Sequence, residues 1–393
     1  MKNTASTLAD LQCSICGTRF DAAELNRTCP SCGRVLFARY DLERAARTLS
    51  LASLAGRVSS LWRYEEVLPL QRAENRADLG EGFTPLLHLP RLGGRAGLRR
   101  LYVKEEGRNP TGTFKARGLA LAVSRAKELG VTEVALPTAG NAGAAAAAYA
   151  ARAGLRCHVA MPADAPPAVM DEVRAYGADL QLVDGLIHDA GRLIAEGCRD
   201  NGWFDLATLK EPYRAEGKKT MGYELWEQFG GSLPELLLYP TGGGTGLVGM
   251  WKAFAELEEM GLCDGRRPRL VAVQASGCAP VVRAFEAGAA RAEPWEDAHT
   301  LAPGIRVPRP FADDLILQSL YASGGDAVAV EDEEIRAAIA EMIAGEGIDA
   351  APEGAATWAA LKKMVDAGKV GADERIVLFN CGTGLKHPEL RPS

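Results

Sequence analysis

The sequence predicts an α/β protein with parallel sheets, preceded by a small cysteine-rich segment. Short apolar runs alternate with helix-forming stretches, which is typical of parallel strands covered by helices on both faces. Several of these runs end in loops rich in glycine and small hydroxyl residues, where ligands of parallel sheets bind. Four of the nine cysteines fall within twenty residues near the N-terminus.

The composition narrows the class of protein. A chain of 393 residues is long enough for two or three domains, and 47% hydrophobic with 24% charged residues is typical of a soluble globular protein. The net charge of −6 argues against a general nucleic-acid binder. No apolar run approaches the ~20 residues that cross a bilayer, and no signal segment opens the chain. We therefore expect a cytoplasmic protein with no membrane partner.

The N-terminal cysteines form two Cys-x2-Cys-Gly pairs, Cys13 with Cys16 and Cys29 with Cys32. Two intervening residues allow both thiolates of a pair to face one metal ion, and four thiolates form a closed structural Zn2+ site. Two disulfides or an iron site are the alternatives. The other five cysteines lie among apolar or glycine neighbours and are expected to be reduced and packed.

Lys115 stands at the predicted start of a helix, after the apolar strand Leu101-Tyr102-Val103 and a turn of Pro, Thr and Gly. The helix dipole disfavours a cation at this end. Burial and nearby positive charge lower the pKa of a lysine, and the neutral amine is then nucleophilic enough to form a Schiff base. The alternative is a surface lysine that opens an ordinary helix.

Three further loops are candidate ligand sites. Thr84 either caps the entry turn or touches a ligand. The loop 138–143 places Thr138 and Asn141 after a strand, and the Asn141 amide either completes a turn or contacts a ligand oxygen. Thr383 lies between two glycines after the last strand, where it can present a hydroxyl.

The stretch from Thr241 to Gly246 follows the apolar strand Leu236–Pro240 and precedes a helix. Its residues Gly242, Gly243, Gly244 and Thr245 expose backbone amides at a helix start, which suits a phosphate. The alternative is a flexible turn. The stretch matches neither a P-loop nor a dinucleotide-binding glycine motif.

The remaining pattern completes the alternation of strands and helices. We predict strands at 133–137, 156–161, 180–183, 270–274 and 376–380. We predict helices at 119–129, 144–152, 168–176, 247–260, 332–345 and 355–367.

A lysine, an asparagine, a phosphate cradle and a hydroxyl at strand ends together match the needs of pyridoxal 5′-phosphate. In these residues the chain resembles the fold-type II family of pyridoxal-phosphate enzymes, and most closely the threonine synthases. The similar motifs are Gly80-Glu-Gly-Phe-Thr-Pro-Leu, Asn109-Pro-Thr-Gly-Thr-Phe-Lys-Ala-Arg, Ala139-Gly-Asn, Glu211-Pro-Tyr-Arg-Ala-Glu-Gly-Lys-Lys-Thr, Pro352-Glu-Gly-Ala-Ala and Gly382-Thr-Gly-Leu-Lys. They span roughly residues 60 to 390, and many threonine synthase-like sequences also carry an N-terminal zinc ribbon.

The resemblance implies two doubly wound α/β domains of the tryptophan synthase β-like class after a zinc ribbon. The implied division is 1–40 for the ribbon, 41–114 and 216–393 for the large domain, and 115–215 for the smaller one. Fold-type II enzymes are commonly homodimers.

The resemblance also implies roles for single residues. Lys115 would anchor the cofactor and move protons. Asn141 would contact the ring oxygen and Thr383 the ring nitrogen, and the loop from Gly242 to Thr245 would bind the phosphate. Arg214 is a candidate for the phosphate of the substrate, with a structural salt bridge as the alternative. Thr84 and Thr138 are further substrate candidates.

The implied reaction converts O-phospho-L-homoserine and water to L-threonine and phosphate. Three departures keep a serine or threonine dehydratase, or a related β-elimination, as the alternative. Ala116 replaces the aspartate usual in threonine synthases, and Ala142 replaces a hydroxyl residue. The Thr-Gly-Gly-Gly-Thr cradle is more similar to those of dehydratases and cysteine synthase relatives.

Overall fold

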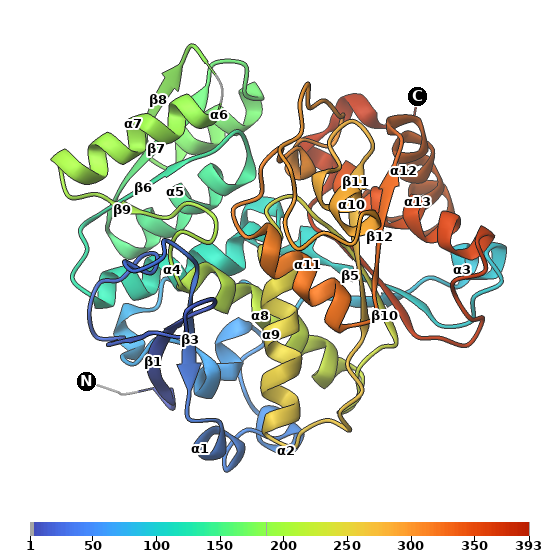
Figure 1. Cartoon of the computed structure of the whole chain (residues 1–393), viewed down its shortest axis with the longest axis horizontal. Coiled ribbons are helices and arrows are strands. Elements are labelled where there is room, and N and C mark those ends of the chain that lie inside the picture. Colours follow the sequence, from blue (N-terminus) through green and yellow to red (C-terminus); the bar gives the residue numbers. More distant parts are fainter. Residues whose placement is uncertain (1–3, 186, 393) are drawn as a thin grey trace.

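The computed structural model describes residues 4–185 and 187–392, which form three sheets (Figure 1). The large sheet has six strands, in the order β12 (Asp326–Val330), β11 (Arg269–Ala275), β10 (Leu236–Pro240), β13 (Ile376–Asn380), β5 (Leu101–Glu105) and β4 (Leu86–His88). Neighbouring strands are parallel except β4, which pairs antiparallel with β5 at the edge. The predicted α/β class is confirmed.

Both faces of the large sheet are buried, because alternate residues of each strand enter different apolar clusters. In β10, Leu237 packs with α8 (Tyr213–Gln228), α9 (Thr245–Glu259), α10 (Pro280–Glu286) and α11 (Asp313–Ala322). Its neighbour Leu238 packs with α3 (Pro90–Arg95), α12 (Asp332–Glu346) and α13 (Pro352–Asp366). Strands that are buried on both faces have continuous apolar sequences, such as Leu236–Pro240.

The smaller sheet is parallel and has the order β8 (Asp179–Val183), β7 (Arg156–Pro162), β6 (Glu133–Pro137) and β9 (Phe204–Asp205). Its apolar residues also alternate between two faces. One face packs with α4 (Lys115–Glu128), α5 (Asn141–Ala153) and α6 (Pro167–Ala175), and the other with α7 (Ile187–Asp200). In Figure 1 this sheet lies to one side of the large one, with α4 and α8 between them.

Three predicted helix starts were late by three or four residues, and one of them is α13, which begins at Pro352 and not at Ala355. The helix α5 begins at Asn141 and not at Ala144, because Gly140 is extended and its amide donates to the Thr138 hydroxyl at 3.1 Å. The helix α4 begins at Lys115, whereas helix-forming sequence was assigned from Leu119. The first turn contains Gly143 in α5 and Gly118 in α4, and glycine lowers helix propensity, so that propensity alone places these starts poorly.

The N-terminal segment forms a three-stranded antiparallel sheet, in the order β2 (Arg19–Phe20), β1 (Leu8–Cys13) and β3 (Leu36–Tyr40). Its apolar residues join the same cluster as α8 and α9. The Tyr40 hydroxyl donates to Glu216 of α8 at 2.8 Å. This small module therefore shares the core of the main body, as expected for a segment too small to bury one alone.

The stretch between the ribbon and the main body, predicted only as a connector, contains short helices. They are α1 (Leu42–Ala46), α2 (Leu51–Leu54) and the 3-10 turns Leu61–Val67 and Ala73–Asn75. Its aromatic residues Trp62 and Tyr64 are buried in the same cluster as α8. The connector thus packs along the body and does not act as a free linker.

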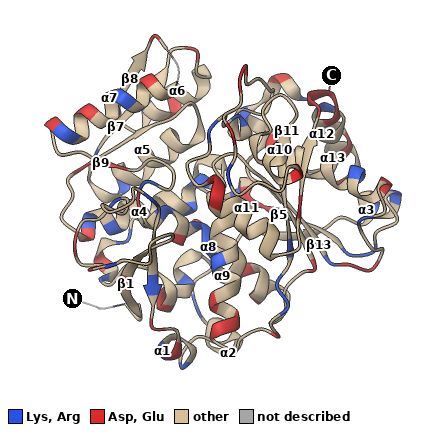
Figure 2. Cartoon of the chain, in the orientation of Figure 1, with Lys and Arg blue, Asp and Glu red and all other residues tan. Residues whose placement is uncertain are grey.

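Charged residues of both signs are interspersed along the helices (Figure 2). Many form pairs between elements, such as Arg34 of the N-terminal segment with Asp314 of α11. In the part of the chain that the structure describes, no helix is long and apolar enough to cross a membrane.

Candidate active site

Three of the predicted site loops follow adjacent strands of the large sheet. β10, β13 and β5 are neighbours and parallel, so the loops after them meet at one edge. Hydrogen bonds join two of these loops directly, since the Thr383 amide donates to Gly112 O and the Phe114 amide to Cys381 O, both at 2.9 Å. The turn of Lys115 and the loop of Thr383 are therefore fixed together.

Lys115 is the first residue of α4, and its Nζ lies 4.4 Å from the centroid of the Phe114 ring. Burial, with the positive charge of Arg214 as a second cause, lowers the pKa of Lys115 to about 8. The helix predicted from Leu119 thus reaches back to Lys115, which lies at its start as expected for this lysine. The neutral form of the amine, which a nucleophile requires, is therefore more populated near neutral pH than in an ordinary lysine.

The loop between β10 and α9 has the form of an anion cradle. The amides of Gly242, Gly243 and Gly244 donate to no acceptor among the described residues. Gly244 has φ 72°, and a Cβ there would lie 2.2 Å from Ile316 Cδ1. A Cβ at Gly242 would lie 2.7 Å from Gly304 O. Because Ile316 and Gly304 lie so close, a side chain does not fit at these two positions. The free amides of the loop can bind a phosphate.

The cradle is held beside Lys115 through aromatic packing. The Phe114 ring meets Tyr239 of β10 edge to face, with centroids 6.1 Å apart. Tyr239 in turn packs against Phe379 of β13 at 5.2 Å. These ring contacts link the turn of Lys115 to β10 and β13.

Asn141 opens α5 and comes from the smaller sheet's side of the site. Its Oδ1 accepts a hydrogen bond from Lys386 Nζ at 3.3 Å. Lys386 closes the short turn Gly384–Lys386 that begins after Thr383. The structure therefore brings Asn141 close to the Thr383 loop. Thr138 lies in the loop just before Asn141, and its hydroxyl is hydrogen-bonded to Gly140.

The Thr383 hydroxyl caps that turn by accepting from the Leu385 amide at 3.2 Å. A hydroxyl that accepts one bond still has a proton to donate and a second lone pair. Thr383 can therefore contact a ligand atom without losing its structural bond.

Arg214 lies on the first turn of α8 and is buried. Its Nη1 donates to Leu206 O at 2.6 Å, and its Nε has no partner among the described residues. No carboxylate lies within 4.0 Å of its guanidinium in that part of the chain, and so the salt-bridge alternative is not seen. Burial raises the pKa of the neighbouring Glu211 to about 7.

Thr84 lies in a buried network of charges. Its hydroxyl donates to Glu106 at 2.6 Å and accepts from Arg117 at 3.2 Å. Arg117, two residues after Lys115, also pairs with Glu224 of α8. Lys104 contacts Glu224 at 2.7 Å, and all four charged side chains are fully buried. The hydroxyl of Thr84 is thus engaged by protein groups, and its contact with substrate stays a prediction.

Three polar residues near the site received no role from the sequence. Besides Lys386, they are Glu353, whose charge acts on Lys115, and Lys218, whose buried amine donates to Phe114 O. All three lie inside motifs that carried the family resemblance. Their place in these motifs could have marked them as site residues, but a motif does not show which of its polar side chains face the site.

The four N-terminal cysteines meet at one point, as predicted. Their sulfur atoms all lie within 4.8 Å of one another, with separations of 3.4 Å for Cys13–Cys32 and 3.6 Å for Cys16–Cys29. Four thiolates at a Zn–S distance of ~2.3 Å would be roughly 3.8 Å apart. The sulfurs are too far apart for disulfides, and the other five cysteines are free as well.

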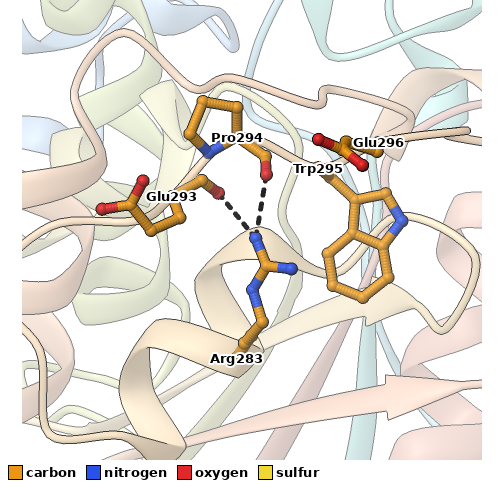
Figure 3. A pocket seen from close by; sticks show the side chains of 5 residues that line it. All are labelled: Arg283, Glu293, Pro294, Trp295 and Glu296. Carbon is orange, nitrogen blue, oxygen red and sulfur yellow. Dashed lines mark hydrogen bonds between the residues drawn. The ribbon is translucent and has the colours of Figure 1, made fainter.

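A separate surface hollow of about 730 Å³ is lined by Arg283, Glu293, Pro294, Trp295 and Glu296 (Figure 3). Its arginine donates to the carbonyls of Glu293 and Pro294 and lies 4.7 Å from the Trp295 ring. None of the predicted site residues lines it. These contacts satisfy the arginine and stabilise the loop.

Comparisons with known proteins agree with this geometry. A family model described as pyridoxal-phosphate dependent enzyme matches residues 77–382. The threonine synthase of Methanocaldococcus jannaschii is 36% identical over 379 residues, which cover 96% of this chain and 93% of that protein. The threonine synthase of Methanosarcina acetivorans is 35% identical, with 96% and 92% covered.

Solved structures show the same fold at lower identity. Maize serine racemase has a TM-score of 0.67 and 22% identity, covering 77% of this chain and 88% of that one. Threonine deaminase isoform 2 from Solanum lycopersicum has a TM-score of 0.66 and 23% identity, covering 78% and 86%. The predicted fold class is confirmed by these likenesses.

Proposed function

The chain belongs to the family of pyridoxal-phosphate-dependent enzymes, and on that premise we propose that it converts O-phospho-L-homoserine and water to L-threonine and phosphate. Relatives named threonine synthase align with 96% of the chain. Their names support the reaction, and the residues around Lys115 supply groups that it needs.

The residues present fit the cofactor. Lys115 offers an amine with a lowered pKa, Gly242 to Thr245 offer open amides for the phosphate, and Thr383 offers a hydroxyl for the ring nitrogen. Asn141 is proposed to donate to the ring oxygen. When bound, pyridoxal phosphate draws electrons from the substrate Cα and so stabilises negative charge there. Lys115 is proposed to anchor the cofactor and to move protons at the substrate Cα and Cβ.

The observation that carries the choice of substrate is the buried Arg214 beside Lys115. Its Nε has no partner and no carboxylate lies within 4.0 Å of the guanidinium among the described residues, while Glu211 and Asp205 act on it from farther away. Such a guanidinium can still bind an anion supplied from outside. The amide cradle already takes one phosphate, and a second anion is expected when the substrate itself is phosphorylated. Thr138 and Thr84 are proposed as further substrate contacts.

A product assay tests the reaction. Supplied with O-phospho-L-homoserine, the protein should release phosphate and threonine in equal amounts. L-serine and L-threonine should give little 2-oxo acid. Rapid 2-oxo acid formation without phosphate release from phosphohomoserine would contradict the proposal and favour the dehydratase, to which the Thr-Gly-Gly-Gly-Thr cradle is more similar.

The lowered pKa of Lys115 predicts a pH dependence for attachment of the cofactor. A protonated amine is not nucleophilic, so the rate at which cofactor-free protein binds pyridoxal phosphate covalently should rise with pH, with its midpoint near pH 8. Arg214→Gln removes a neighbouring positive charge and should move this midpoint to higher pH. Arg214→Lys keeps the charge and should shift it less. A midpoint unchanged in Arg214→Gln, followed by absorbance, would contradict the assigned cause.

We propose that the cysteine cluster holds a structural zinc ion. The closed arrangement of Cys13, Cys16, Cys29 and Cys32 leaves no position for chemistry. Metal analysis should find about one zinc per chain, and Cys29→Ser should lose most of it and lower Tm. Cys263→Ser, outside the cluster, should keep the metal. Undamaged protein with much less than one zinc per chain would contradict this.

We also propose that the protein works in the cytoplasm, as a homodimer, on a small amino acid. The four clustered thiols and the five separate free cysteines support a reducing compartment. Light scattering that gives the mass of a single chain would contradict the dimer.

A further inference from the structure

Lys386 is the cationic side chain that the structure places against Asn141. Its Nζ lies 3.3 Å from Asn141 Oδ1 and 2.6 Å from Glu172 of α6. Both charged side chains of this pair are about four-fifths buried, with exposures of 18% and 22%. The carboxylate of Glu172 balances the charge of Lys386, so that the lysine can approach a neutral amide.

The path of Lys386 is fixed by the turn that precedes Lys115. Gly112 has φ 66°, and a Cβ there would lie 3.4 Å from Lys386 Cε and 2.8 Å from Thr383 Cγ2. The lysine stem therefore crosses over the bare glycine to reach Asn141. Three residues earlier, Thr383 faces the same turn through its amide bond to Gly112 O.

The chemistry of the contact decides which way the Asn141 amide points. The two ends of an asparagine amide look alike in shape, and its orientation follows from its hydrogen bonds. A lysine ammonium only donates, so the atom that it contacts must be the oxygen. The Asn141 Nδ2 is then turned away from Lys386, and it has no hydrogen-bond partner among the described residues.

We propose that Lys386 is a positioning residue, which holds the Asn141 amide so that its NH2 group remains available to the cofactor. The inference rests on the proposed contact between Asn141 and the ring oxygen. Without Lys386, the amide can rotate and present its oxygen, which cannot donate to an oxygen of the cofactor. The effect on the cofactor is therefore exerted through Asn141 alone.

The test measures binding of pyridoxal 5′-phosphate to cofactor-free protein and the pH titration of its visible absorption band. Lys386→Met should raise the apparent Kd about 3- to 10-fold, as expected for one hydrogen bond, and should shift the pH dependence of the band. Lys386→Arg, which can still donate, should restore both. Lys369→Met is the control, because Lys369 also forms a lysine–carboxylate pair, with Asp326, although its side chain is more exposed and lies at the other end of the large sheet.

A double variant separates this inference from the proposed function. If Lys386 acts through Asn141, Lys386→Met should change nothing further in an Asn141→Ala background. Additive effects, or a Lys386→Met protein indistinguishable from the Lys369→Met control, would overturn the role of Lys386 and leave the proposed reaction standing. If Asn141→Ala itself leaves the Kd and the absorption band unchanged, the proposed cofactor contact fails, and the inference with it.

Discussion

Lys115→Ala is expected to abolish covalent attachment of pyridoxal phosphate and to lower kcat by at least ~1,000-fold, because one side chain is both anchor and proton carrier. The buried surroundings that lower the pKa of Lys115 contain a second amine, Lys218, which donates to Phe114 O. Because the Lys218 amine is hydrogen-bonded to this backbone carbonyl, we do not expect Lys218 to replace Lys115.

The measurement is activity together with the visible band of the purified protein. Lys127→Ala, near the end of the same helix, is the matched control and should keep both. Unfolding curves should show that the Lys115→Ala protein is folded, since removal of a partly buried amine relieves desolvation. A folded Lys115→Ala protein with the visible band and a tenth or more of the activity would refute the assignment.

The largest effect on stability is expected for Arg117→Met. Arg117 contacts Glu106 through Nε at 2.6 Å and Glu224 through Nη2 at 2.7 Å, and these side chains have no exposed surface. Removing one partner of a buried ion pair leaves uncompensated charge and costs about 3–5 kcal/mol. Here two carboxylates would be left with Lys104 as their nearby cation.

Urea denaturation measures this change in the free energy of unfolding. Arg117→Lys keeps a charge but loses the fork geometry, and we expect an intermediate loss. Arg47→Ala removes an exposed pair with Glu43 and should have little effect. A loss for Arg117→Met no larger than that for Arg47→Ala would contradict the structural role of the network.

The strands and loops of the site could be predicted because they follow general rules. Strands such as Leu236–Pro240 are buried on both faces and read as short apolar runs, and the structure places this one at those bounds. The loops after them lie at one edge because parallel strands point the same way. Lys115 was expected at the start of the following helix, although the sequence placed the first helical residue four positions too late.

The helix α8 could not be recognised from periodicity. Between Tyr213 and Trp226 every residue is buried, charged ones included. Glu216, Lys219 and Glu224 form ion pairs inside the protein, so the helix has no polar face turned to water. An amphipathic pattern is absent from such a helix, and only knowledge of the partners explains its sequence.

The contacts between distant residues were likewise beyond the sequence. Lys386 and Asn141 are 245 positions apart, and the motifs that contain them do not show that they touch. Thr84 illustrates the converse case. Its place in a motif suggested a ligand contact, whereas the structure places its hydroxyl between Glu106 and Arg117.

The central claim is that Lys115 carries the cofactor, and chemical trapping tests it most directly. Reduction of the cofactor-loaded protein with borohydride makes the bond between the lysine and pyridoxal phosphate permanent, and peptide mass spectrometry then locates it. We predict the added mass on the peptide containing Lys115. Added mass on Lys218 or Lys219 would contradict the claim that Lys115 carries the cofactor. So would the absence of added mass on every lysine of a protein that had bound the cofactor.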